Sequence, residues 1–122
     1  MFTFPRERLN EARKVLDLKY PVSVKITSGR KTRTGSWRFK ENRHYITVSK
    51  MQSLNEINKT LWHELQHAAD YENYLSHDFP KKVAPVMYRS FVTERSARNA
   101  EKKYAHFWLA VPSGVRIQAI HF

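Results

Sequence analysis

Residues 53–70 read SLNEINKTLWHELQHAAD, and this stretch carries the clearest structural signal in the chain. Ser53 followed three residues later by Glu56 is a capping box, in which the two side chains satisfy free backbone N–H groups at a helix start. Apolar residues recur every three or four positions along the stretch, at Leu54, Ile57, Leu61, Leu65 and Ala68. The pattern predicts a helix that runs to about Leu75 and packs one apolar face on the domain.

Two histidines stand four residues apart on this predicted helix. His63 and His67 therefore lie one turn apart on the same face, where two imidazoles can bind one zinc ion. Glu64 follows the first histidine, so its carboxylate can take a proton from a water activated by the metal. Two surface histidines on an ordinary helix are the competing interpretation. The capped start and the apolar face favour the metal site.

A catalytic zinc site needs a third protein ligand and leaves a fourth position for water. Glu94 is the preferred candidate, because it falls on or beside the inward face of a second long helix expected from about Pro85 to about Trp108. His77, in the loop after the helix that carries His63 and His67, is the alternative ligand. Asp70 and Glu101 could orient the metal histidines, although we interpret both as surface charges.

The flanking segments predict the rest of the fold. A helix is expected after Pro5, followed by a strand at Val22–Thr27 and two further strands at 36–40 and 44–49. An extended tail is expected at 115–122. The chain is thus predicted to be one α+β domain, 1–122. Its expected parts are an N-terminal helix, a small, mostly antiparallel three-stranded sheet, the histidine helix, a second long helix bearing Glu94, and the extended C-terminal tail.

The composition limits the chemistry and the partners. The chain has no cysteine, so disulfides are excluded and a metal site must use His, Asp or Glu. No apolar run approaches the ~18 residues that span a bilayer, and the N-terminus does not resemble a secretory signal. A cytoplasmic monomer without a membrane partner is therefore expected.

The 122 residues carry a net charge of +11, which favours a polyanionic partner. Basic residues between Arg30 and Arg43 alternate with Trp37 and Phe39, as on surfaces that track phosphates and stack bases. Nucleic acid is therefore a possible partner through this hairpin. A solvated hairpin is the slightly favoured alternative.

The His63-Glu64-Leu65-Gln66-His67 motif, with Glu94 on a following helix and Ala97 one turn beyond it, resembles the gluzincin metallopeptidases. The resemblance is closest to the small minigluzincins and covers about residues 36–104. It implies a zinc metalloendopeptidase that acts on proteins or peptides. It also implies that His63, His67 and Glu94 bind zinc and that Glu64 is the general base.

Minigluzincins have a C-terminal stretch that occupies the cleft, so by analogy residues 115–122 could inhibit the enzyme as in a zymogen. A strand that completes the sheet is an equal alternative. The second resemblance is to SprT-like proteases, which act on DNA-bound proteins and use a histidine as third ligand. Here, however, no His-Gly follows the motif, because Asp78 follows His77. A nucleic-acid-binding module with a structural or degenerate zinc site is the remaining alternative.

Overall fold

The computed structural model describes residues 1–28 and 34–122, and the predicted α+β class is confirmed. None of the described helices combines the length and apolarity needed to cross a bilayer. In chain order the described elements are β1 (Phe2–Thr3), α1 (Arg6–Val15), β2 (Val22–Thr27), β3 (Gly35–Lys40), β4 (Arg43–Ser49), α2 (Leu54–Leu75), α3 (Ala84–Phe91), α4 (Glu94–Lys103), β5 (Val111–Pro112) and β6 (Ala119–His121).

The main sheet has the strand order β3-β4-β2-β6. Strands β3 and β4 form an antiparallel hairpin, whereas β2 and β4 are parallel, with Val22 opposite His44. The predicted number of three strands is therefore wrong, because β6 adds a fourth, whereas two of the three described strand pairings are antiparallel, as expected, and only the central one is parallel. The chain crosses from β2 to the far edge before it returns as β4, and local alternation of residues does not encode that crossing. Strands β1 and β5 form a separate antiparallel pair.

The C-terminal tail completes the sheet. Strand β6 pairs with β2, and the amide of Val22 donates a hydrogen bond of 2.6 Å to the carbonyl of Phe122. The Phe122 side chain is buried in the core. Of the two roles that the sequence allowed, residues 119–121 thus take the structural one. They lie at the opposite edge of the sheet from β3.

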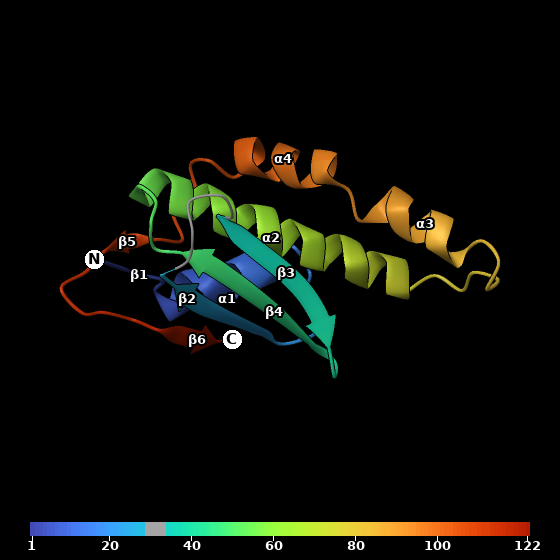
Figure 1. Ribbon diagram of the computed structural model, residues 1–122, viewed down its shortest axis with the longest axis horizontal. Helices are drawn as coiled ribbons and strands as arrows, with labels where there is room; N and C mark the ends of the chain where they lie inside the picture. Colours follow the sequence, from blue (N-terminus) through green and yellow to red (C-terminus); the bar gives the residue numbers. More distant parts are fainter. Residues whose placement is uncertain (29–33) are drawn as a thin grey trace.

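Alternate residues of each strand face opposite sides of the sheet. Trp37 lies opposite Ile46, and this set of side chains packs with the helices into the core. Ser36 and Arg38, opposite Thr47 and Tyr45, face the other side. Figure 1 shows α2 running alongside the β3–β4 hairpin, with α3 and α4 on its outer side. The sheet therefore has one face covered by helices and one open face.

Helix α2 follows its prediction closely. It begins after Ser53, whose hydroxyl oxygen accepts a hydrogen bond of 3.2 Å from the amide of Glu56, and the Glu56 carboxylate accepts one of 3.2 Å from the amide of Ser53. Both bonds of the predicted capping box are thus present. The buried face includes Ile57, Leu61, Leu65 and Ala68, which anchors the histidine-bearing turns against the sheet.

The prediction of one long second helix is wrong, because the helix is interrupted at Val92 and Thr93, which separate α3 from α4. Thr93 has extended backbone angles, and its hydroxyl accepts a hydrogen bond of 3.0 Å from the amide of Ser96. Thr93 is therefore the N-cap of a new helix, a position that threonine favours over a helix interior. As a result, Glu94 is the first residue of α4 rather than a residue of a helix interior.

Strand β3 approaches α2 closely at Gly35. A Cβ atom at this position would lie 2.5 Å from Thr60 Cγ2 and 3.0 Å from the carbonyl oxygen of Thr47. The Gly35→Ala variant is expected to lower the free energy of unfolding by about 1–3 kcal/mol through overpacking. Urea denaturation measures the change. Gly114→Ala is the matched control, since nothing lies within 4 Å of its Cβ position. Equal losses in both variants would contradict the close approach.

Candidate metal centre

The two motif histidines converge on a carboxylate from the neighbouring helix. His63 and His67 project from α2 with ring centroids 4.9 Å apart. Glu94, at the start of α4, places Oε2 3.0 Å from His63 Nε2 and Oε1 2.8 Å from His67 Nε2. One ligand atom from each residue lies within 4.8 Å of the others, so the group could hold a metal ion. The structure thus brings together the three residues that the sequence singled out as metal ligands.

The contacts of His63 suit a cation at its Nε2 atom. Its Nδ1 lies 2.9 Å from Glu101 Oε2, while its Nε2 faces Glu94. A neutral imidazole has one N–H and cannot donate to both carboxylates, so this geometry calls for a second proton or a metal ion. Ligand atoms stand about 3.3 Å apart in a tetrahedral zinc site with bonds of about 2.05 Å. The two contacts to Glu94 are shorter than this by a few tenths of an ångström, so these atoms would move apart slightly around an ion.

Glu101 is placed to orient His63. It lies two turns after Glu94 on α4, and its hydrogen bond to Nδ1 leaves Nε2 for the metal, as is usual for zinc-bound histidines. The interpretation of Glu101 as a surface charge is therefore wrong. Asp70 plays another part, because it accepts a hydrogen bond of 2.8 Å from Gln66, one turn earlier on α2, and has no contact with the histidines that would orient them.

His67 is the more deeply buried of the two histidines. Burial lowers its pKa below the ordinary value; the Glu94 carboxylate opposes this shift, and the nearby His63 ring adds to it. A lowered pKa keeps the ring neutral at pH 7, which leaves a nitrogen lone pair for a metal. The ring packs beside Trp37 of β3, with centroids 6.0 Å apart. The edge strand of the sheet thereby forms one wall of the site.

Glu64 lies on the same side of α2 as the donor atoms. Its side chain is buried, and Oε1 is 4.0 Å from His67 Nε2. Glu94, by contrast, keeps 62% of its side chain exposed. The cluster is therefore closed on the side of the sheet and open on the side of Glu94. Glu64 itself lies on the closed side, with its carboxylate beside His67 Nε2.

His77 does not reach this cluster. Its Nδ1 lies 2.7 Å from the carbonyl oxygen of Asn73, and its ring stacks on Phe79 with centroids 5.5 Å apart. The alternative of His77 as third ligand is therefore not supported, and the same holds for a third histidine ligand as in SprT-like proteases. His121 is also engaged elsewhere, since its Nδ1 lies 2.7 Å from Ser23 Oγ.

Sequence reasoning missed a buried pair next to the site. His44, which lies outside the zinc motif, is fully buried, and its Nε2 lies 2.7 Å from Glu72 Oε2. Trp37 Nε1 donates a hydrogen bond of 3.1 Å to His44 Nδ1. Trp Nε1 is only a donor, so the proton of the neutral His44 ring sits on Nε2 and points to Glu72. The signal was available, because His44 alternates with Ile46 on the inward face of its predicted strand.

Trp37 and Phe39 lie on the helix-covered face of the sheet. They pack on Tyr71, one turn after His67, with centroids 5.3 and 5.0 Å away. Their predicted role as stacking platforms of a basic hairpin is therefore wrong. The basic positions 30, 31 and 33 of that hairpin lie outside the described residues. Burial raises the pKa of Tyr71, as do the neighbouring tyrosines, so its hydroxyl keeps its proton near pH 7.

Comparisons of the chain with protein-family models, with curated proteins and with solved structures found no match.

Proposed function

We propose that this chain is a zinc-dependent endopeptidase in which His63, His67 and Glu94 hold the metal. The observation that carries the proposal is the convergence of two imidazole Nε2 atoms and one carboxylate, with the Glu64 carboxylate beside them and one side open. Two nitrogens and one carboxylate oxygen, with a vacant corner, form the donor set of hydrolytic zinc sites. Thiolate-preferring metals have no suitable ligand here, because the chain lacks cysteine.

Zinc, when bound, lowers the pKa of a water to about 7 and polarises the scissile carbonyl. The chain's own residues supply the proton transfers and the orientation. Glu64 takes the proton of the attacking water and later delivers it to the leaving amine. Glu101 holds His63 with Nε2 turned toward Glu94. The protonated hydroxyl of Tyr71 is a candidate donor to the developing oxyanion.

The edge strand β3 is the natural place for an extended peptide. Its outer edge has no partner strand among the described strands, and its Trp37 packs against His67. A peptide that pairs with such an edge gains main-chain hydrogen bonds without regard to its sequence. A protein or peptide substrate is therefore proposed, with its backbone running beside the metal ligands.

A zinc titration tests whether the proposed site binds the metal. The protein, stripped with a chelator and titrated with zinc, is expected to bind one equivalent and to unfold at a higher temperature, since a saturating ligand stabilises by about 2.7 kcal/mol at 100 times its Kd. His67→Ala is expected to lose the site. Glu101→Gln is expected to weaken binding by about 10–100-fold, as is usual for partners of ligating histidines.

The matched control is Glu11→Gln, which removes an exposed carboxylate from α1 and should bind zinc as the wild type does. Isothermal titration calorimetry with a competing chelator measures all four proteins. A wild type that regains no zinc would overturn the proposal. So would equal affinities for wild type and His67→Ala.

A further inference from the structure

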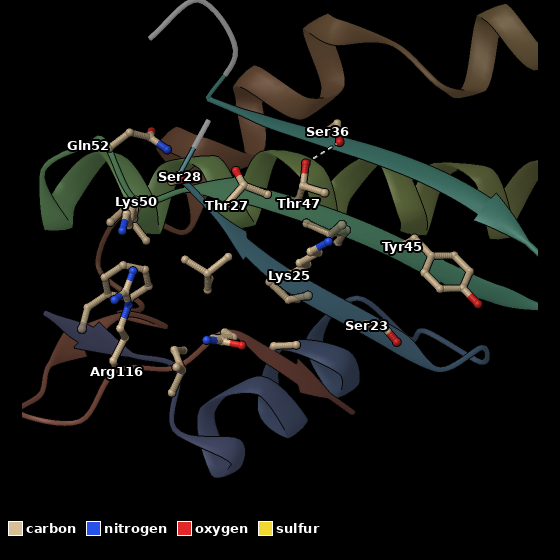
Figure 2. A pocket seen from close by; sticks show the side chains of 18 of the residues that line it. Ser23, Lys25, Thr27, Ser28, Ser36, Tyr45, Thr47, Lys50, Gln52 and Arg116 are labelled. Atoms are coloured by element: carbon tan, nitrogen blue, oxygen red, sulfur yellow. Dashed lines mark hydrogen bonds between the residues drawn. The ribbon is translucent and has the colours of Figure 1, made fainter. Parts of the chain in front are cut away.

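A large cavity opens on the face of the sheet that the helices leave uncovered. Its volume is about 1290 Å³. Figure 2 shows Lys25, Tyr45 and Thr47 projecting from the strands on the side away from α2. The metal cluster lies on the other side, where α2 packs. The cavity is therefore a second surface, separate from the proposed active site.

The charged side chains that line this cavity are all basic. Lys25, Arg38, Lys50 and Arg116 line it, and no Asp or Glu is among the described residues that line it. None of the four has a carboxylate within 4.0 Å among the described residues, where Lys19 is the only lysine or arginine in an ion pair. Cations gathered without counter-charges repel one another and focus a positive potential in the hollow. An anion bound there relieves that repulsion.

The uncharged part of the lining supplies hydrogen-bond donors. Thr27, Ser36 and Thr47 contribute hydroxyl groups from three neighbouring strands; those of Ser36 and Thr47 are hydrogen-bonded to each other, which leaves one proton of this pair for a ligand. Hydroxyls and basic side chains together make most protein contacts to phosphate oxygens in nucleic-acid complexes. Tyr45 adds a flat ring to the same face, with the guanidinium carbon of Arg38 5.7 Å from its centroid. Such a ring is a platform on which a base can stack.

We propose that this cavity binds a single-stranded nucleic acid, with Lys25, Lys50 and Arg116 on its phosphates and Tyr45 against a base. An acidic peptide fits less well, because extended peptides pair with a strand edge, whereas a sheet face offers side chains and no free backbone groups. A flexible single strand can enter a hollow that a stiff double helix would only bridge. The proposal does not rest on peptidase activity, since it uses other residues on the opposite face.

The test compares two triple variants of equal net charge. K25Q/K50Q/R116Q removes three cations from the cavity. K81Q/K82Q/R89Q removes two lysines and one arginine that are exposed on and before α3. Fluorescence anisotropy measures the binding of a labelled oligo(dT) strand of about 16 nucleotides, the upper end of typical site sizes, over a range of salt concentrations. A polyglutamate peptide of equal length is measured beside it.

The cavity variant is expected to flatten the plot of log K against log salt by about 2, because each lost phosphate contact on a single strand contributes about 0.7. If both proteins bind equally at 1 M salt, where phosphate contacts contribute little, the variant should bind roughly 100-fold more weakly than the wild type at 0.1 M salt. The control variant should bind within a few-fold of the wild type. Tyr45→Ala should weaken binding roughly tenfold, and Tyr45→Phe, which keeps the ring, should not.

Three outcomes would overturn the proposal. In the first, the two triple variants lose affinity equally, so that binding follows total charge. In the second, the wild type does not bind the oligonucleotide at all. In the third, polyglutamate binding depends on the cavity residues and oligonucleotide binding does not, which assigns the cavity to acidic proteins. Unchanged zinc content and melting temperature show that each variant is folded.

Discussion

Replacing Glu64 by glutamine is expected to leave zinc bound and to slow peptide hydrolysis by about 10²–10⁴-fold at pH 7. Glutamine keeps the shape of the side chain, which matters because Glu64 is buried and its Cγ lies 3.4 Å from the Cβ position at Gly35. It cannot accept a proton from water, however. The variant therefore removes the base and keeps the scaffold, so that any loss of rate reports on proton transfer.

A library of quenched fluorescent peptides, assayed with zinc-loaded protein, measures this rate. Zinc content is determined on the same samples, so that a loss of metal is not mistaken for a loss of the base. Glu11→Gln is again the matched control and should cleave as the wild type does. Equal rates for Glu64→Gln and wild type would exclude Glu64 as the base. A zinc-loaded wild type that cleaves no peptide would contradict the enzymatic proposal and leave the metal site standing.

Replacing Glu72 by alanine is expected to lower the free energy of unfolding by about 2–4 kcal/mol, because buried donors that lose their acceptor cost about 1–3 kcal/mol each. The Glu72 carboxylate is 8% exposed and serves three donors. It accepts hydrogen bonds of 2.7 Å from His44 Nε2, 2.6 Å from the amide of Lys19 and 3.2 Å from the amide of Tyr20. Alanine leaves all three without this acceptor, and the segment before β2 loses its attachment to α2.

The effect of Glu72 should also depend on pH. Burial by itself would raise the pKa of this carboxyl, but the hydrogen bonds from His44 and the two backbone amides outweigh it, so the pKa lies below the ordinary value. A lowered pKa stabilises the fold above the carboxyl's unfolded pKa of about 4.3 and loses that effect as the pH falls through the folded pKa. The difference between wild type and Glu72→Ala should therefore shrink below about pH 4.

Urea denaturation at several pH values measures both predictions for Glu72. Asp17→Asn is the control, because Asp17 forms an exposed pair with Lys19 and asparagine tolerates its positive φ of 54°. Exposed pairs contribute about 0–1 kcal/mol. A Glu72→Ala variant no less stable than this control would show that the buried pair contributes little. A difference that grows in acid would contradict the sign of the pKa shift.

The parts of the fold that were predicted correctly are those with local causes. Helix α2 needs only its capping box and an apolar stripe, both contained within its own residues. Strands β2, β3 and β4 follow from alternation and turn residues over a few positions. The histidine pair follows from the same helical period. Glu94 was found on a pattern that assumed one continuous helix, and Thr93 instead places it at the start of a new one.

The parts that were missed depend on residues far apart in the chain. The parallel pairing of β2 with β4 and the addition of β6 are set by packing, because hydrogen bonds between strands have no sequence period of their own. The pair of His44 and Glu72 joins residues 28 positions apart. A lone histidine in a strand carries no mark of such a partner. The open, basic face was predicted only in part, through Arg38 of the basic hairpin, since Lys25, Lys50 and Arg116 reach it from other segments of the chain.

The alternation of residues along the β3–β4 hairpin constrains how such a chain can vary. Each strand serves two surfaces with every second residue: Trp37 faces the helices and Arg38 faces the open side. A substitution can therefore alter one surface and spare the other. A one-residue insertion or deletion inside β3 or β4 would exchange the two sets, since a slip of one position turns the later side chains of that strand to the opposite face. Residues of β3 and β4 can therefore be substituted more readily than the lengths of the two strands can be changed.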